Sequence, residues 1–218
     1  MEQDLPLYQL IFVMIIPLIF AVVIHEVAHG WVANQLGDPT ARLLGRLTLN
    51  PIKHIDVIGT LIVPTLLAIL GGFIFGWAKP VPVNWNNLQH PRRDMALVAI
   101  AGPAMNLLMA IAWALLFGLL VQAGSKESLV TVLLVKMCLY GLMINVILFV
   151  LNLLPIPPLD GSRVVTSLLP NNTARTYNLL EPFGFFILLG LIATGVLGIV
   201  MKPLINSVLQ FIQAAFMT

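Results

Sequence analysis

Long apolar runs dominate the chain and are separated by short polar stretches, with the runs at residues 7–36, 57–75, 95–121, 129–154 and 183–201. A helix needs about 20 apolar residues to cross a bilayer, and each run is near or above that length. The run at 57–75 differs from the others because it contains the breakers Gly59, Pro64, Gly71 and Gly72. The pattern predicts an all-α polytopic membrane protein with about five hydrophobic segments, of which the interrupted one is a candidate for re-entry.

Two further segments modify this picture. Residues 76–85 alternate loosely and predict a small extended or β insert, which Pro80 and Pro82 would confine to a sheet edge. The tail after Pro203 is too short to cross a membrane easily, so we expect a C-terminal interfacial helix there. We expect a single membrane-embedded domain over residues 1–218, with its core at 7–161 and C-terminal helices at 183–218.

Composition agrees with a membrane protein. The chain has 218 residues, of which 59% are hydrophobic and only 9% are charged. A soluble domain carries roughly 25% charged residues, so this chain has too little polar surface for water. The formal net charge of +2 gives no indication of nucleic-acid binding. The lipid bilayer is therefore the expected surrounding, whereas the oligomeric state stays open.

The basic residues between the apolar runs indicate the topology. Arg42, Arg46 and Lys53 precede the run at 57–75, and Lys79, Arg92 and Arg93 follow it. Lys and Arg prefer the cytoplasmic side of a membrane, so both groups lie there only if this run enters and returns. Re-entry also makes the run at 129–154 parallel to the first run. We therefore expect a multi-pass cell-membrane protein, with the C-terminal ends of the first and fourth runs toward the cytoplasm.

The first apolar run carries an H-E-x-x-H pattern at residues 25–29. On a helix, His25 and His29 lie four residues apart on one face, so both imidazoles can bind one cation. Glu26 lies beside them and could act as a general base on a water molecule. Ionisable groups inside an apolar helix are costly and are rarely incidental. The pattern predicts one zinc ion per chain, with Glu26 as the catalytic residue.

A catalytic zinc site usually has three protein ligands and an open position. No Glu or His follows His29 at the spacing of soluble zinc proteases, so the third ligand must come from elsewhere. Asp160 is the candidate, because it ends the fourth run after Pro155, Pro157 and Pro158. If the fourth run is parallel to the first, Asp160 lies at the same membrane face as the histidines.

Two asparagines within or next to the apolar runs are candidates for substrate binding. Asn106 and Asn152 could hydrogen-bond the backbone of an extended substrate. A hydrogen bond between helices is the alternative for each of them, and for Asn106 the two interpretations are equally favoured.

Other functions fit parts of the pattern. A membrane metal transporter could use the same ligands, but it would need polar residues that continue across the membrane. A catalytically silent metal-binding scaffold would have no need of the carboxylate of Glu26.

The paired motifs resemble the site-2 protease family of intramembrane zinc metalloproteases, peptidase M50 type. Its signatures correspond here to the H-E-x-x-H pattern at 25–29 and to the N-x-x-P-x-P and L-D-G elements at 152–161. Residues 102–106 resemble a G-P-x-x-N element of the family, and the similarity extends over about residues 7–160. The chain is most similar to the compact prokaryotic branch without a PDZ domain.

The resemblance implies roles for particular residues. It implies zinc binding by His25, His29 and Asp160, and general-base catalysis by Glu26. It also implies that the substrate is a transmembrane protein, which is hydrolysed at a peptide bond in or near its membrane-spanning segment.

Overall fold

The computed structural model describes residues 6–63, 77–123 and 128–216. These residues are mostly helical, and no strand is assigned among them. The helices are α1 (Leu7–Gln35), α2 (Thr40–Leu43), η1 (Pro51–His54), η2 (Val57–Ile62), η3 (Trp85–Asn87), α4 (Pro91–Gln122), α5 (Leu129–Asn152), α6 (Asp160–Leu168), α7 (Asn171–Asn178), η4 (Glu181–Phe183), α8 (Gly184–Ala193) and α9 (Val196–Phe216).

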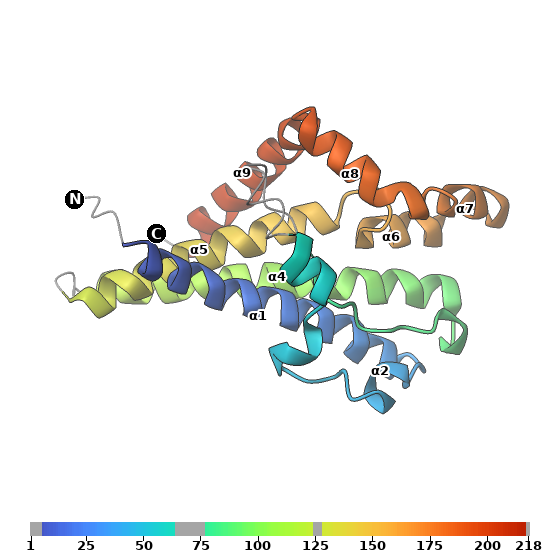
Figure 1. The fold of residues 1–218 in the computed structure, drawn as a ribbon, viewed down its shortest axis with the longest axis horizontal. Coiled ribbons are helices and arrows are strands. Elements are labelled where there is room, and N and C mark those ends of the chain that lie inside the picture. Colours follow the sequence, from blue (N-terminus) through green and yellow to red (C-terminus); the bar gives the residue numbers. More distant parts are fainter. Residues whose placement is uncertain (1–5, 64–76, 124–127, 217–218) are drawn as a thin grey trace.

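Helices α1, α4 and α5 pack side by side and form the centre of the molecule (Figure 1). Helix α4 is antiparallel to α1, because His29 contacts Val98 and the earlier residue Ala21 contacts Asn106. It is also antiparallel to α5, because Asn145 contacts Asn106 and the earlier residue Gly141 lies against Trp113. Helix α5 is consequently parallel to α1. The structure therefore contains the parallel arrangement of the first and fourth apolar runs that the charge distribution predicts.

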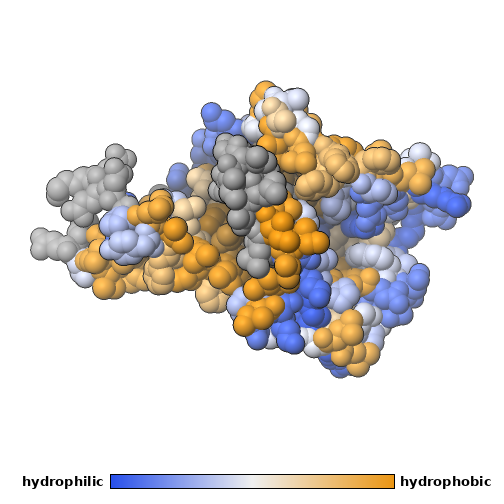
Figure 2. Space-filling model, viewed as in Figure 1, coloured by the Kyte–Doolittle hydropathy of each residue, from blue (hydrophilic) through white to orange (hydrophobic). Residues whose placement is uncertain are grey.

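In the part of the chain that the structure describes, five helical segments are long and apolar enough to cross a membrane: α1, α4, α5, the continuous stretch Asn171–Ala193, and α9. Large apolar side chains are exposed along the bundle, as expected where lipid replaces water. Figure 2 shows this hydrophobic surface along the bundle, with hydrophilic residues gathering at the end that carries α2 and α7. The all-α polytopic membrane fold predicted from the sequence is confirmed.

The connection between α1 and α4 leaves and returns at the same end of the bundle. Helix α1 ends at Gln35, and Gly37 follows two residues later with a φ of 111°, which is accessible mainly to glycine. The backbone N–H of Gln89 then donates to the carbonyl of Leu36 at 3.1 Å, which brings the start of α4 beside the end of α1.

Within this connection, the N–H of Trp77 donates to the carbonyl of Gly59 at 3.1 Å. The chain therefore makes no net crossing between these two residues. Most of the predicted re-entrant run, residues 64–76, lies outside the described residues.

The predicted insert is extended but forms no strand in its described part, residues 77–84. Its alternate amides are bonded within the protein: Lys79 N–H donates to His54 O at 2.9 Å, and Val81 N–H donates to Glu26. Because Pro80 and Pro82 have no N–H, the other edge of the segment cannot donate the regular series of backbone hydrogen bonds that a β-sheet needs. We call residues 77–84 the strap.

Asp38 fixes the ends of the connection to each other. Its carboxylate accepts hydrogen bonds from Thr40, from the backbone N–H of Asn84 and from the amide of Asn87. The side chain is fully buried. Burial alone would raise the pKa of Asp38, but these hydrogen bonds outweigh it and hold the pKa below its usual value.

The C-terminal boundaries differ from those predicted. The run at 183–201 is divided by Gly195, whose φ of 74° ends the helical path after α8. Pro203 lies inside α9 instead of ending a span, and α9 has 21 residues. The fully buried Ile212 packs into the cluster formed by α4 and α5, so the segment after Pro203 is part of the bundle. The boundaries predicted from the sequence for the last two segments are therefore wrong. Apolar composition does not indicate where one residue with a positive φ interrupts a helix.

Candidate metal centre

His25 and His29 lie one turn apart in α1 and face α4. Both side chains are buried, with 8% of each residue exposed. Their Nε2 atoms approach each other to 3.0 Å. The H-E-x-x-H pattern thus brings two imidazoles to one point, as its helical spacing predicts.

Asp160 joins the histidines from the first turn of α6. Its Oδ2 lies 3.2 Å from His25 Nε2 and 3.3 Å from His29 Nε2. The three candidate ligand atoms lie within 4.8 Å of one another. Residues 135 positions apart in the chain therefore meet, because α5 returns the chain to the end of the bundle where α1 carries the histidines.

The other ring nitrogen of each histidine is bonded to an oxygen atom. His29 Nδ1 lies 2.7 Å from the carbonyl of Val98, and His25 Nδ1 lies 2.5 Å from Oδ1 of Asn106. A carbonyl oxygen only accepts, so Nδ1 donates in both neutral rings. The lone pairs of both Nε2 atoms therefore point to the shared position, as in histidines that bind a metal.

The arrangement of these atoms fits a bound cation. Two Nε2 lone pairs face each other at close range, and the buried Oδ2 of Asp160 has no hydrogen-bond partner among the described residues. A positive ion would satisfy all three atoms at once. Two neutral imidazoles and one carboxylate are a donor set typical of catalytic zinc, which leaves a fourth position free.

Gly102 of α4 permits this geometry. A Cβ atom at this position would overlap the imidazoles of both His25 and His29. The absence of a side chain thus lets α4 lie directly against the Nε2 edges of the two rings. This close packing explains why glycine occupies the position.

Glu26 is half-buried on α1, beside the two histidines. Its Oε2 accepts a hydrogen bond from the backbone N–H of Val81 at 2.7 Å. Val81 is buried, and a Cβ on Gly30 would lie 2.6 Å from its side chain. The strap therefore packs tightly against α1 and fixes one oxygen of the Glu26 carboxylate.

The loop that carries Asp160 is held by the segments that follow it. Tyr177 Oη donates to the carbonyl of Pro155 at 2.8 Å. Gly161 and Gly184 have no room for a Cβ, because the loop backbone at Leu153 and Pro157 is too close. The position of Asp160 thus depends on close backbone contacts with α6 and α8.

The two asparagines predicted to bind substrate lie in different environments. Asn106 is fully buried, and its amide contacts His25, Ala21 and Asn145. It makes the interhelical hydrogen bonds that the sequence left as the equal alternative. Asn152 is half-buried and donates to Leu148 O at 3.0 Å in its own helix. Substrate binding by Asn152 stays a prediction.

The sequence reasoning missed Asn145, which is fully buried and bonds to Asn106 at 3.0 Å. The sequence does mark Asn145 as a candidate, because it is a polar residue in the middle of an apolar run. The contact with Asn106 could not be predicted without knowing how α4 and α5 face each other.

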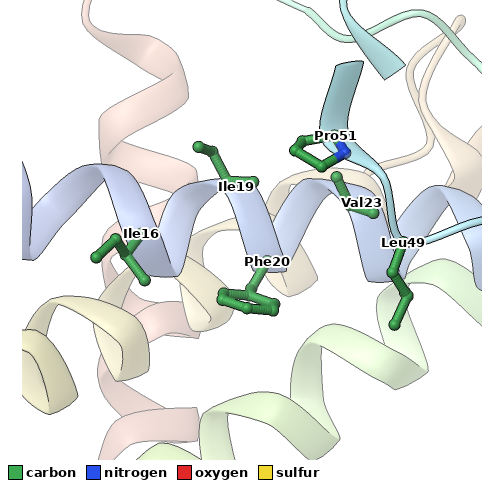
Figure 3. Close-up of a pocket in the computed structure, with 6 residues that line it drawn as sticks. All are labelled: Ile16, Ile19, Phe20, Val23, Leu49 and Pro51. Atoms are coloured by element: carbon green, nitrogen blue, oxygen red, sulfur yellow. The ribbon is translucent and has the colours of Figure 1, made fainter. Parts of the chain in front are cut away.

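A separate apolar cavity of about 220 Å³ lies on α1 (Figure 3), lined by Ile16, Ile19, Phe20, Val23, Leu49 and Pro51. None of its lining residues belongs to the cluster around His25, so it does not contribute to the candidate metal centre.

Comparison with known proteins assigns the chain to a family. The family described as "Peptidase family M50" matches residues 13–191. The chain is 39% identical over 209 residues to "Putative zinc metalloprotease YwhC" of Bacillus subtilis, which covers 93% of this chain and 92% of that protein. It is 34% identical over 172 residues to "Putative zinc metalloprotease Rip2" of Mycolicibacterium smegmatis, covering 78% of this chain and 62% of that protein. No solved structure matches the chain significantly. The family match over most of the chain, together with a relative that aligns nearly end to end, shows that the chain belongs to peptidase family M50, the site-2 protease family of membrane zinc metalloproteases.

Proposed function

We propose that this protease hydrolyses peptide bonds in or near the transmembrane segments of membrane proteins, with one zinc ion per chain. The observation that carries the proposal is the meeting of His25, His29 and Asp160 beside Glu26 within a bundle of membrane-spanning helices. A protease centre in such a position is suited to substrates that themselves lie in the membrane.

In this proposal His25 and His29 would hold the zinc through Nε2, and Asp160 would hold it through a carboxylate oxygen. When bound, the zinc supplies Lewis-acid chemistry, which polarises a peptide carbonyl and makes water a better nucleophile. The hydrogen bonds of Nδ1 to Asn106 and Val98 keep both Nε2 lone pairs available.

Glu26 acts as the general base. Its carboxylate takes a proton from the attacking water and gives it to the leaving amine. The hydrogen bond from Val81 N–H to Oε2 leaves Oε1 as the oxygen for this transfer. The bond also holds the carboxylate in one orientation, which reduces the reorganisation needed for the reaction.

The substrate must unwind locally, because a helix hides its peptide groups in its own hydrogen bonds. Asn152 is the last residue of α5, directly before the loop that leads to Asp160, and its carboxamide oxygen could accept a hydrogen bond from an unwound substrate. The described N–H groups of the strap at Trp77, Lys79 and Val81 are already used within the protein. Donation from these amides would require the strap to move.

The basic residues that flank the connection support a location in a prokaryotic cell membrane, with the centre toward the cytoplasm. Arg46 and Lys79 lie next to each other at the end of the bundle that carries His29, where Arg46 donates to the carbonyl of Lys79. By the positive-inside tendency, this end is cytoplasmic.

Cleavage by purified protein tests the proposal. The wild type and Glu26→Gln are reconstituted with a model transmembrane substrate, and zinc content and cleavage are measured in the same samples. We expect the wild type to cleave and Glu26→Gln to retain zinc without cleaving. Full cleavage by Glu26→Gln would refute the proposed role of this residue. Zinc passage across sealed vesicles, without cleavage, would favour a transporter, and zinc binding with neither activity would favour a scaffold.

A further inference from the structure

Asn145 is a polar residue in the middle of membrane helix α5 to which the proposed mechanism gives no role. It is fully buried. A carboxamide in such surroundings is costly unless its donor and acceptor groups are bonded. Asn145 Nδ2 donates to the carbonyl of Gly141 at 2.8 Å, and its Oδ1 accepts from Asn106 Nδ2 at 3.0 Å. Both ends of the amide are thus satisfied.

These bonds have a fixed polarity. The carbonyl of Gly141 can only accept, so Nδ2 of Asn145 faces it and Oδ1 faces α4. Oδ1 also only accepts, so Asn106 must turn its own Nδ2 toward α5. The carbonyl of Ala21, 3.2 Å from Asn106 Nδ2, favours the same orientation. As a result, Oδ1 of Asn106 is left facing His25.

The orientation of Asn106 determines which nitrogen of His25 carries the proton. Oδ1 of Asn106 lies 2.5 Å from His25 Nδ1, and a neutral ring carries one proton, so Nδ1 holds it and Nε2 is free. If Asn106 were flipped, its NH₂ group would face Nδ1. The proton would then lie on Nε2 and would block metal binding at that atom.

His29 has no such dependence. Its Nδ1 bonds to the backbone carbonyl of Val98, which cannot exchange donor for acceptor by rotation. The two histidines of the same motif therefore differ, because only His25 relies on a side chain that can flip.

We propose that Asn145 is a positioning residue which, through Asn106, holds His25 in the tautomer that binds metal through Nε2. This inference rests on the proposed zinc centre and deepens it. Asn145 hydrogen-bonds Gly141 and Asn106, and it acts on His25 from α5 through Asn106.

The tautomer of His25 can be measured directly. Metal-free protein with ¹⁵N-labelled histidine is placed in lipid bilayers at pH 8, and solid-state NMR reads which ring nitrogen is protonated. The chain has four histidines, and the signal of His25 is assigned with a His25→Gln variant. In the wild type we expect His25 with its proton on Nδ1. A wild-type His25 protonated on Nε2 would overturn the proposal without need of any variant.

The variant Asn145→Leu removes the acceptor while keeping a similar volume. We expect a mixture of His25 tautomers and a Kd for zinc, measured by chelator competition, raised about tenfold, the low end for outer partners of metal ligands. Val146→Ala is the matched control, since Val146 is the next residue and is equally buried. It should change neither quantity.

Unchanged tautomer and unchanged Kd in Asn145→Leu would overturn the proposal, as would equal effects of Val146→Ala. Neither measurement uses cleavage. A wild type that binds zinc but cleaves no membrane substrate would therefore contradict the proposed function alone.

Discussion

The carboxylate of Glu26 accepts a hydrogen bond from the backbone N–H of Val81, 55 residues later in the chain, at 2.7 Å. Val81 stands between Pro80 and Pro82, which have no N–H, so its amide is the only donor of this tripeptide. The strap thus gives this one donor to the residue proposed as the general base. This relationship connects the polar insert to the reaction.

Removal of that donor should slow cleavage. The substitution Val81→Pro deletes the N–H while keeping an apolar side chain. A hydrogen bond to a charged group contributes about 1.5–3 kcal/mol, so we expect kcat to fall by about tenfold or more. Zinc content should stay at the wild-type level. Val81→Ala, which keeps the N–H, is the control, and a larger loss of kcat in that variant would show that packing of the side chain matters instead.

Gly102→Ala should weaken the metal centre. The added Cβ would overlap the rings of His25 and His29, so one of them must move away from the shared position. We expect zinc affinity, measured by chelator competition, to fall by at least about tenfold. Gly118→Ala in the same helix is the matched control, because the nearest atom to its Cβ would be 3.7 Å away. Equal zinc affinity in both variants would contradict the proposed contact.

Gly184→Ala tests the support of the Asp160 loop from α8. A Cβ at this position would overlap the carbonyl of Pro157, which precedes Asp160 by three residues. We expect reduced zinc affinity through displacement of Asp160. A Cβ at Gly190 in the same helix would meet no atom of the described residues within 4 Å, so Gly190→Ala should leave the affinity unchanged. If Gly184→Ala binds zinc like the wild type, the loop does not depend on this contact.

The apolar pattern predicted the central helices closely, since residues 95–121 and 129–154 lie within or near α4 and α5. The position of a membrane-spanning helix depends on the apolar composition of many neighbouring residues, so the local sequence is enough to predict it. The break at Gly195 and the continuation through Pro203 depend on single backbone conformations, which composition does not determine.

The candidate metal centre was also predictable only in part. His25, Glu26 and His29 share one helical turn, so their proximity follows from spacing alone. The approach of Asp160 required a topology argument from charged residues. The role of Asn106 depends on which faces of α1, α4 and α5 contact one another. Several arrangements of three helices fit the same apolar pattern, so the sequence does not determine these contacts.

Asp38 should make the stability of the fold depend on pH. Because its pKa is lowered in the folded protein, its stabilising contribution is complete above the unfolded value of about 4 and is lost as the pH falls through the folded value. Asp38→Asn should therefore lower the Tm in detergent at pH 7, and the difference from the wild type should shrink below about pH 4. A difference that stays constant from pH 7 to pH 3 would contradict the proposed hydrogen-bonded carboxylate.

The zinc content of single-site variants tests the central claim most directly. Elemental analysis of the purified protein should give one zinc per chain for the wild type, and His25→Ala, His29→Ala and Asp160→Ala should each lose it. His54→Ala is the matched control, because His54 is a buried histidine bonded to the carbonyl of Thr48, outside the proposed centre. It should retain one zinc per chain. Zinc retained at the wild-type level in Asp160→Ala, or lost equally from His54→Ala, would contradict the assignment of these three ligands.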